Sequence, residues 1–433
     1  MMFRTMLFRL PLIALLMLAM AGSGPAQEDI FKNGTEFGIG ARAIGLGGAY
    51  VAAGDDYAAS YWNPAALALI RRFEVSGGMT HLVRENDASF SGQLINDQFT
   101  ITRLKAIGFA YPVPTYRGSL VFSFGYNRIK EYDANFAFST FNPLPEDSVQ
   151  QGWREREEGS LNNWTIAGAV DLSPRLSAGV GLNIWTGKDT YQFTEKEEDN
   201  LDIYTFDRYR RDDLIESDVT GVNFTFGALY RINTHMRLAA TMSTPVTLTV
   251  NENWATTEET TFDDFSVDRA EDNGEFEYKI RSPFKFTVGG SVNMAGLLIT
   301  GQLEFVDWTQ IRYQSEPPIE GLTRAEANDQ IVERYRMVQR LRFGAELTLP
   351  GSATQIRAGY FRDPLPFKWA TDRDDRIYYS LGIGLLLDKQ VKLDVAYVLG
   401  KWEEVNSGLN NYVTRISESI TQSKVFATLS FRL

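Results

Sequence analysis

The residues best suited to catalysis are scarce in this sequence. It has no cysteine and only two histidines, His81 and His235. His81 falls in the outward phase of an alternating segment and His235 in a short turn, so neither is placed as the base that a hydrolase serine requires. Only carboxylates remain, and they show no paired catalytic motif. The sequence therefore predicts that the protein is not an enzyme, and it offers no metal or cofactor motif.

Basic side chains form a second group that could do chemistry, because several fall on the inward phase of alternating segments. An arginine fork matches a carboxylate, so such a base could bind the acidic head of a ligand. The same bases could instead pair with Glu304, Glu346 and Asp394, which share the inward phase. The candidates for ligand contact are Arg231, Arg237, Lys285, Arg342 and Arg357, with Lys105 and Lys392 in the same phase.

Aromatic residues in a long acidic segment are a third group. Tyr191, Phe193, Tyr204 and Phe206 could form an outer groove that captures apolar molecules, or they could pack the segment over the rest of the fold. The acidic runs around them could bind divalent cations between lipopolysaccharides, or they could be plain solvated charge.

Composition and the start of the chain indicate an exported protein. Residues 1–26 have the form of a signal peptide: Arg4 and Arg9 precede an apolar run and then small residues, with cleavage expected after Ala26 or, alternatively, after Ala21. No later run reaches the roughly eighteen apolar residues of a membrane-spanning helix. The lack of cysteine excludes a lipoprotein anchor and disulfides, and the net charge of -12 argues against nucleic acid as a partner.

Alternation of apolar and polar residues predicts many strands long enough to cross a bilayer. Short turns such as "SPR" and "DKQ" alternate with long polar connections, which is typical of outer-membrane barrels. Because hydrocarbon cannot satisfy an open sheet edge, the sheet must close on itself. We therefore expect an all-β fold, a 14-stranded antiparallel transmembrane β-barrel, with strands near 73–83, 104–113, 119–129, 162–172, 175–187, 219–232, 235–245, 283–294, 297–309, 338–349, 354–362, 376–387, 390–400 and 423–433.

The segment "GIGARAIGLGGAYVAAGDDYAASYWNPAAL", residues 38–67, is apolar and rich in glycine. A fourteen-stranded barrel is too wide for wall side chains to fill, so we expect this segment to plug it as a hatch. Gly45, Gly47 and Gly48, together with Gly38 and Gly40, would let its backbone turn tightly and approach the wall. Asn63 and Pro64 suit a helix N-cap and first helical position, with a short helix over 65–70. The expected organisation is a signal peptide over 1–26, a hatch over 27–70 and a barrel over 71–433.

The run "GARAIGLGGAYVAAGDDYAASYWNPAAL" resembles the hatch of the FadL/TodX outer-membrane transporters of hydrophobic compounds, and "LEFVDWTQI" and "IRAGYFRDPLPF" are similar to later parts of that family. The resemblance implies a monomer in the outer membrane of a Gram-negative cell. Hydrophobic molecules such as long-chain fatty acids would be caught between outer loops 188–218 and 246–282. They would then leave sideways through an opening beside a kink in the third strand. Asn63, Pro64 and Ala65 would gate that opening, near Gly118 or Gly125.

Two other functions fit the same fold. PorV-type barrels have a similar "GARAIGLGGA" and "NPA" opening, and they bind partner proteins of a bacterial secretion system. A general porin would carry an open aqueous channel, but it would normally lack an apolar plug at its N-terminus. Co-purifying proteins would indicate the first alternative, and a large steady conductance would indicate the second.

Overall fold

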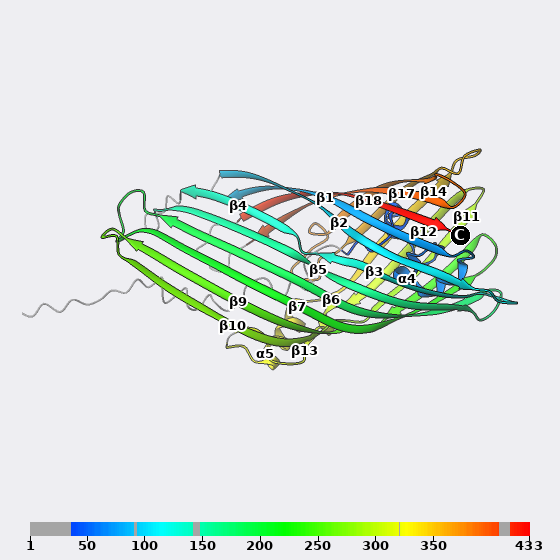
Figure 1. Cartoon of the computed structure of the whole chain (residues 1–433), viewed down its shortest axis with the longest axis horizontal. Helices are drawn as coiled ribbons and strands as arrows, with labels where there is room; N and C mark the ends of the chain where they lie inside the picture. Colours follow the sequence, from blue (N-terminus) through cyan, green and yellow to red (C-terminus); the bar gives the residue numbers. More distant parts are fainter. Residues whose placement is uncertain (1–35, 91–92, 142–147, 320, 407–415) are drawn as a thin grey trace, which may run out of the picture.

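The fold is described from a computed structural model that covers residues 36–90, 93–141, 148–319, 321–406 and 416–433. The predicted signal peptide and the first part of the expected hatch therefore lie outside the described residues. The described chain consists mainly of long strands wrapped around a few short helices (Figure 1).

Fourteen antiparallel strands form one closed sheet, and the predicted fold class is confirmed. The last strand pairs with the first from Glu74–Arg432 to Ser89–Ser417, which closes the ring. Four strands are interrupted, so each of them is divided into two segments. The segments are β1 (Glu74–Phe90), β2 (Gln93–Val113), β3 and β4 (Leu120–Glu131, Ala134–Phe141), β5 (Gln150–Asp171), β6 (Leu176–Glu198), β7 (Phe206–Arg231), β8 and β9 (Met236–Ser243, Thr247–Phe262), β10 and β11 (Val267–Arg281, Lys285–Met294), β12 and β13 (Leu297–Asp307, Arg312–Tyr313), β14 (Met337–Thr348), β15 (Gln355–Asp363), β16 (Arg376–Leu386), β17 (Val391–Asn406) and β18 (Ile416–Arg432).

Side chains alternate between lipid and lumen as the sequence pattern predicts. On β5, Trp164 and Ile166 are 40% and 48% exposed, whereas the alternate residues Asn163 and Thr165 are 2% and 1% exposed. An apolar outer face and a polar inner face are the arrangement that a bilayer requires of a barrel. The same alternation continues around the sheet, for example at Phe224 and Phe226 on β7 and at Leu381 and Ile383 on β16.

The strands are longer on one side of the barrel than the sequence suggests. Residues 188–218 and 246–282, expected to be loops, are mostly continuations of β6, β7, β9 and β10, with turns only at 199–205 and 263–266. The β6–β7 ladder runs unbroken from Leu176–Tyr230 to Glu198–Arg208. Beyond the membrane both faces of a strand meet water, so the apolar phase that reveals a strand disappears.

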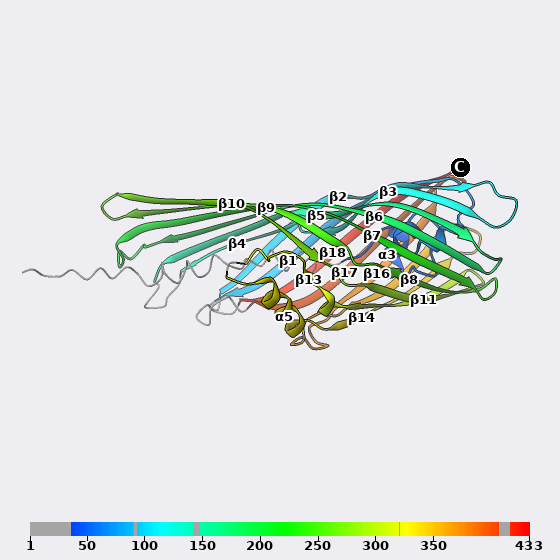
Figure 2. The ribbon, with the colours of Figure 1, turned by 90° about the horizontal axis from the view of Figure 1, so that it is seen from below.

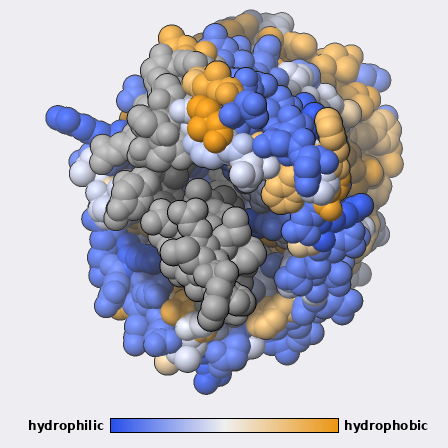
Figure 3. All heavy atoms as spheres, turned by 90° about the vertical axis from the view of Figure 1, so that its left-hand side faces the viewer, coloured by the Kyte–Doolittle hydropathy of each residue, from blue (hydrophilic) through white to orange (hydrophobic). Residues whose placement is uncertain are grey.

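These extensions of β5, β6, β7 and β9, together with β4 and β10, form what we call the outer sheet. It projects well beyond the rest of the barrel (Figure 2). Seen from this end, the surface is mainly hydrophilic, and its hydrophobic residues gather in separate groups and on the flank (Figure 3).

The helices are short and lie inside or on top of the barrel. Three belong to the hatch, α3 (Ala41–Gly45), α4 (Ala59–Trp62) and the 3-10 helix η1 (Pro64–Leu69), and they occupy the end with the short turns (Figure 1). The 3-10 helix η2 (Trp308–Gln310) follows β12, and α5 (Arg324–Arg334) lies beside β13, about halfway along the molecule (Figure 1). Among the described residues, no helix is both long and apolar enough to cross a membrane.

Candidate functional site

The hatch is held close to the wall because glycines on the strands leave room for its backbone. A Cβ on Gly359 of β15 would overlap the backbone nitrogen of Gly47, and one on Gly344 of β14 would overlap the carbonyl of Leu46. Gly47 and Gly48 have φ angles of 65° and 74°, which other residues adopt only with strain. The many glycines in the sequence therefore serve both the turns of the hatch and its seat.

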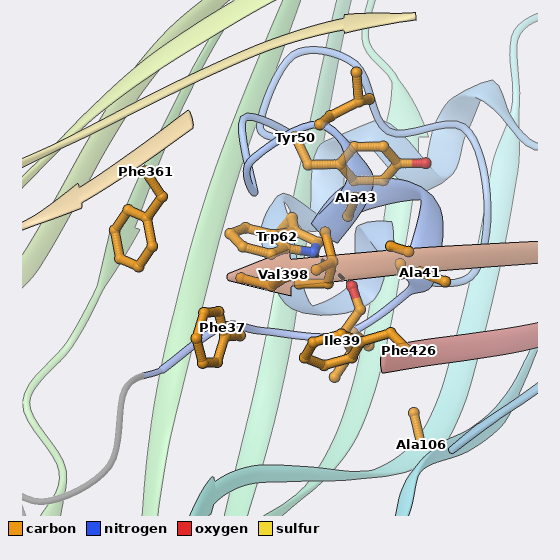
Figure 4. Packing of buried hydrophobic residues seen from close by; sticks show 14 of the residues in the cluster. Phe37, Ile39, Ala41, Ala43, Tyr50, Trp62, Ala106, Phe361, Val398 and Phe426 are labelled. Carbon is orange, nitrogen blue, oxygen red and sulfur yellow. Dashed lines mark hydrogen bonds between the residues drawn. The ribbon is translucent and has the colours of Figure 1, made fainter. Parts of the chain in front are cut away.

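Aromatic and aliphatic side chains complete this seat. Phe37 packs edge-on against Tyr378 of the wall, with ring centroids 5.0 Å apart. It packs in the same way against Phe426, at 5.9 Å (Figure 4). The indole nitrogen of Trp62 donates a hydrogen bond of 2.9 Å to the carbonyl of Ile39 within the hatch. The hatch is therefore a packed unit with its own core, and not a loose tail.

The Asn63-Pro64-Ala65 turn caps η1 as expected. The Asn63 side chain accepts a 3.0 Å hydrogen bond from the backbone of Ala65, and its amide donates to the carbonyl of Val51 at 2.8 Å. The turn sits on Gly179 of β6 and Gly227 of β7, where a Cβ would overlap it. These are the fifth and sixth strands of the barrel, so the turn lies away from the expected sites at Gly118 and Gly125.

The hatch residue that reaches Gly125 is Tyr57. A Cβ on Gly125 of β3, or on its register partner Gly108 of β2, would overlap the Tyr57 ring. The Tyr57 hydroxyl also donates a 3.0 Å hydrogen bond to the side chain of Asn127 on β3. Tyr57 is thus a hatch residue that contacts the third strand, and the gating role expected of the turn stays a prediction.

A buried ion network fixes the hatch to the opposite wall. Arg42 donates two hydrogen bonds to Glu346 on β14, at 2.8 and 2.9 Å, and a further one to Asp55. Glu346 also accepts from Arg357 on β15 at 2.6 Å, and Arg357 lies 2.8 Å from Asp394 on β17. Because buried charges are costly unless they are paired, this network holds the hatch in one position.

A cavity of about 150 Å³ lies on the outer side of the hatch. The hatch residues Glu36, Tyr61 and Trp62 form its floor. Amides and hydroxyls on the inner faces of β5, β6 and β7 form one wall, and they hydrogen-bond to each other, as in the 3.0 Å bond from Asn183 to Thr225. A space of this size holds a molecule about as large as benzene.

Charged residues form a belt around the cavity close to the floor. Lys285 donates to both carboxylate oxygens of Glu36, at 3.0 and 2.9 Å. Burial alone would raise the pKa of Glu36, but the positive charges of Lys285 and Arg340 hold this pKa below its usual range. Arg340 pairs with Glu304 at 2.9 Å, and Arg342 lies over the Phe361 ring with its guanidinium carbon 3.6 Å from the centroid. The belt is thus largely self-compensated.

The outer part of the cavity is apolar. Its lining includes Leu161, Trp185, Leu248, Val306 and Trp308. These side chains belong to a larger hydrophobic cluster that α5 and the segment after β15 complete from the outer end. The apolar lining therefore lies between the outer sheet and the charged belt.

The third strand is irregular where it borders the cavity. A bulge at Ile129 shifts its register against β5, and the strand is interrupted between β3 and β4. Within the described residues, β2 pairs with this strand only from Ala106–Asn127 to Val113–Leu120, although β2 itself extends out to Gln93. We call the boundary beyond Ala106–Asn127, between β2 and the third strand, the seam. Ile129 and Lys130 line the cavity beside it.

The predicted ligand contacts are divided among three places. Lys285 and Arg342 line the cavity. Arg231 and Arg237 are register partners at the end with the short turns, where Arg231 pairs with Asp171 at 2.6 Å. Arg357 is fully buried in the hatch network, 2.6 Å from Glu346. Lys105 and Lys392 pair with Glu131 and Asp394.

The predicted capture aromatics all lie on the outer sheet or at its tip. Tyr191 and Phe193 are on β6 in the phase of Trp185, and the rings of Tyr204 and Phe206 stack 5.7 Å apart at the start of β7. Their role stays a prediction.

Several cavity residues escaped the sequence analysis, above all Glu36, Trp62, Trp185, Trp308 and Arg340. For Trp185 and Arg340 a signal was present, because each lies on the inward phase of a strand whose other inward residues were noticed. Glu36 and Trp62 lie in the hatch, where no strand phase indicates which way a side chain points. Trp308 lies within the expected strand 297–309 in the phase of Glu304, so a signal was present there too, although the structure ends this strand at Asp307 and places Trp308 in η2.

Fold and site together define a class: a plugged transmembrane barrel with a partly apolar cavity above its plug. A family model described as outer membrane protein transport protein (OMPP1/FadL/TodX) matches residues 35–430. The chain belongs to this family, whose members are outer-membrane channels for hydrophobic compounds and not enzymes.

Solved structures share the fold at low sequence identity. The toluene transporter TodX of P. putida has a TM-score of 0.62 at 12% identity, covering 92% of this chain and 99% of its own. A Pseudomonas aeruginosa FadL homologue gives 0.60 at 14% identity over 92% and 97%. The Ralstonia pickettii toluene transporter TbuX gives 0.58 at 14% identity over 92% and 99%. No curated protein sequence matches the chain.

Proposed function

We propose that this chain transports small hydrophobic compounds, such as aromatic hydrocarbons and long-chain fatty acids, and releases them sideways into the outer membrane through the seam. The observation that carries the proposal is the position of the cavity: its lining includes Ile129 and Lys130, directly beside the point where the β2–β3 ladder ends. The hatch blocks the axial path below the cavity, so the wall offers the other way out.

Capture begins on the outer sheet in this proposal. Tyr191 and Phe193 continue the inner face that Trp185 begins at the cavity, and the Tyr204–Phe206 stack lies at the tip. Apolar molecules would pass from these rings to the cluster around Trp308 and then into the cavity. Lys285 and Arg342 would face an acidic head group if the ligand carries one.

Lateral release follows from the free energy of apolar burial. Burying a chain of about fifteen methylenes contributes roughly 12 kcal/mol as an upper bound, at about 0.8 kcal/mol each. A ligand that left through water would lose most of this free energy. A ligand that moves from the cavity into lipid stays out of water throughout, so release needs only an opening in the wall.

In this proposal, the hatch contributes the closed floor. Asn63, Pro64 and Ala65, together with Gly45, Gly47 and Gly48, keep it seated, and Tyr57 lies against the last paired residues below the seam. We expect the barrel to act as a monomer, because apolar side chains are exposed to lipid around the whole circumference. The outer sheet would then stand within the lipopolysaccharide layer.

A reversible cross-link across the seam tests the proposal. The chain has no cysteine, so an Arg103→Cys/Asp133→Cys variant can be joined by a short bis-methanethiosulfonate linker and freed by reductant. Uptake of radiolabelled toluene and radiolabelled oleate is measured in cells that express it. Linking should stop uptake of whichever compound is carried, and reduction should restore it.

The matched control is an Ile107→Cys/Tyr126→Cys variant, whose residues are register partners on the same two strands below the seam. Linking there should leave uptake unchanged. Uptake that survives the seam linker would contradict lateral release. Stoichiometric co-purification of another protein, with no uptake of either compound, would favour the PorV-type function instead.

A further inference from the structure

Among the described residues, the seam is bridged by charged side chains and not by a ladder of backbone hydrogen bonds. Arg103 on β2 donates to both carboxylate oxygens of Asp133, which lies in the interruption between β3 and β4, at 2.7 and 3.2 Å. Closer to the ladder, Lys105 on β2 lies 3.6 Å from Glu131 on β3. Both links join the two elements whose backbone pairing ends at Ala106–Asn127.

Asp133 holds the outer of these two links together. Its side chain is completely buried, and it also accepts a 3.1 Å hydrogen bond from Arg128 of its own strand. Arg128 in turn donates to the carbonyl of Gly159 on β5 at 2.9 Å, so this end of the link is tied to the continuous wall. One carboxylate therefore balances two guanidinium groups that would otherwise face each other.

Apolar side chains lie near the link on both sides of the wall, together with the charged side chains of Lys105, Lys130 and Glu131. Outside, Leu104 and Ile107 of β2 are 47% and 52% exposed to lipid. Inside, Ile129 and Tyr132 belong to the two hydrophobic clusters that meet at the cavity. A hydrophobic molecule that crosses the seam thus meets apolar surface before and after the charged link.

We propose that Arg103, Asp133 and Arg128 form an ionic latch that holds the seam closed and sets how often it opens to the bilayer. The proposal rests on lateral release as the function of the seam. A side-chain link suits this role because it can part and re-form without unzipping a ladder of backbone hydrogen bonds. Arg103, whose side chain is 32% exposed, is the member that can swing away, while Asp133 and Arg128 stay with the wall.

The first test replaces Asp133 by asparagine, which keeps the shape and removes the charge. A Leu161→Cys substitution places a single thiol in the cavity lining, and the protein is reconstituted in phosphatidylcholine vesicles. The thiol is then treated with N-pyrenylmaleimide, which partitions into the bilayer, or with a sulfonated maleimide, which stays in water. Removing one partner of a buried charge pair strongly shifts the equilibrium that the pair controls, here the one between the closed and the open seam. Because Arg103 is partly exposed, we expect the open population to rise by about tenfold.

Asp133→Asn should therefore raise the rate with the bilayer reagent about tenfold and leave the rate with the sulfonated reagent within about twofold. The matched control is Asp171→Asn, which removes the carboxylate of another buried pair, with Arg231, at the end with the short turns. It should change neither rate. Equal rates for Asp133→Asn and the unsubstituted protein, or equal increases with both reagents, would overturn the latch.

A second variant tests the latch in case Asp133→Asn fails to assemble. Arg103→Gln leaves Asp133 paired with Arg128, so no buried charge is orphaned, and the bilayer reagent should still react about threefold faster. No change in this variant would also overturn the proposal. The seam linker separates the two ideas: if linking blocks uptake while both latch variants behave like the unsubstituted protein, lateral release holds and the latch is wrong. If linking leaves uptake intact, the proposed function itself fails.

Discussion

Replacing Arg42 by glutamine should loosen the hatch from the barrel wall. Arg42 donates two hydrogen bonds to Glu346, at 2.8 and 2.9 Å, and another to Asp55. Glutamine removes the charge and is too short to make the same contacts. Since the pair with Glu346 joins the hatch to β14 directly, its loss acts on the docking of the hatch and not on the barrel itself.

The size of the effect follows from the partners that remain. Breaking a buried ion pair by removing one partner costs about 3–5 kcal/mol. Glu346 keeps its 2.6 Å pair with Arg357, and the Asp55 side chain is 38% exposed, so neither carboxylate is left wholly without compensation. We therefore expect the low end of the range, about 3 kcal/mol, which raises the population of the undocked hatch by roughly a hundredfold.

Planar-bilayer conductance measures that population. The unsubstituted protein should show small or no conductance, and Arg42→Gln should show openings with a total open time about a hundredfold longer. Arg156→Gln is the matched control, because its pair with Glu158 is half exposed on both sides and such pairs contribute little. A correctly assembled Arg42→Gln barrel, identified by heat-modifiable mobility, with unchanged conductance would refute the role of the network.

Three further outcomes are expected. Gly227→Val should displace the hatch turn, because a Cβ at this position overlaps the Asn63 side chain. Limited proteolysis should then cut the hatch faster than in the unsubstituted protein. A Gly77→Ala control should not differ, since a Cβ there meets nothing within 4 Å. Trp308→Ala should weaken binding of the fluorescent probe N-phenylnaphthylamine about tenfold, because it removes apolar lining of the cavity. Trp308→Phe should keep most of the affinity. Equal affinity in the two variants would place the probe elsewhere. The lowered pKa of Glu36 means that its stabilisation is complete above its ordinary pKa of 4.5 and declines as the pH falls below that value. Hydrogen-exchange protection factors in the hatch, which are corrected for the pH dependence of intrinsic exchange, should therefore fall between pH 5 and about pH 3, and Glu36→Gln should lack this dependence.

Much of the barrel could be predicted because a bilayer leaves the sequence little freedom. Each crossing strand must alternate, so the phases of Trp164 and Asn163, or of Ile184 and Asn183, appear directly in the sequence. The hatch was also predictable, because a glycine-rich apolar segment before the first strand has no other place to pack.

The rest depended on contacts that no local pattern encodes. The outer sheet escaped prediction because strands wet on both faces lose the alternating signal. The charged belt joins residues far apart in the chain, as in the pair of Glu36 with Lys285, so neither partner identifies the other. The seat of the Asn63 turn depends on Gly179 and Gly227, and glycines in strands have several possible causes that only the packed structure distinguishes.

The central claim is that the space above the hatch holds the hydrophobic compound during transport. The most direct measurement is a crystal structure of the protein with 1-bromonaphthalene, in which the anomalous signal of bromine locates the ligand without reference to its shape. The account predicts a bromine peak within the cavity, between the hatch residue Trp62 and the apolar lining at Trp185 and Trp308. Peaks confined to the lipid-facing belt, with this cavity filled only by water, would contradict it.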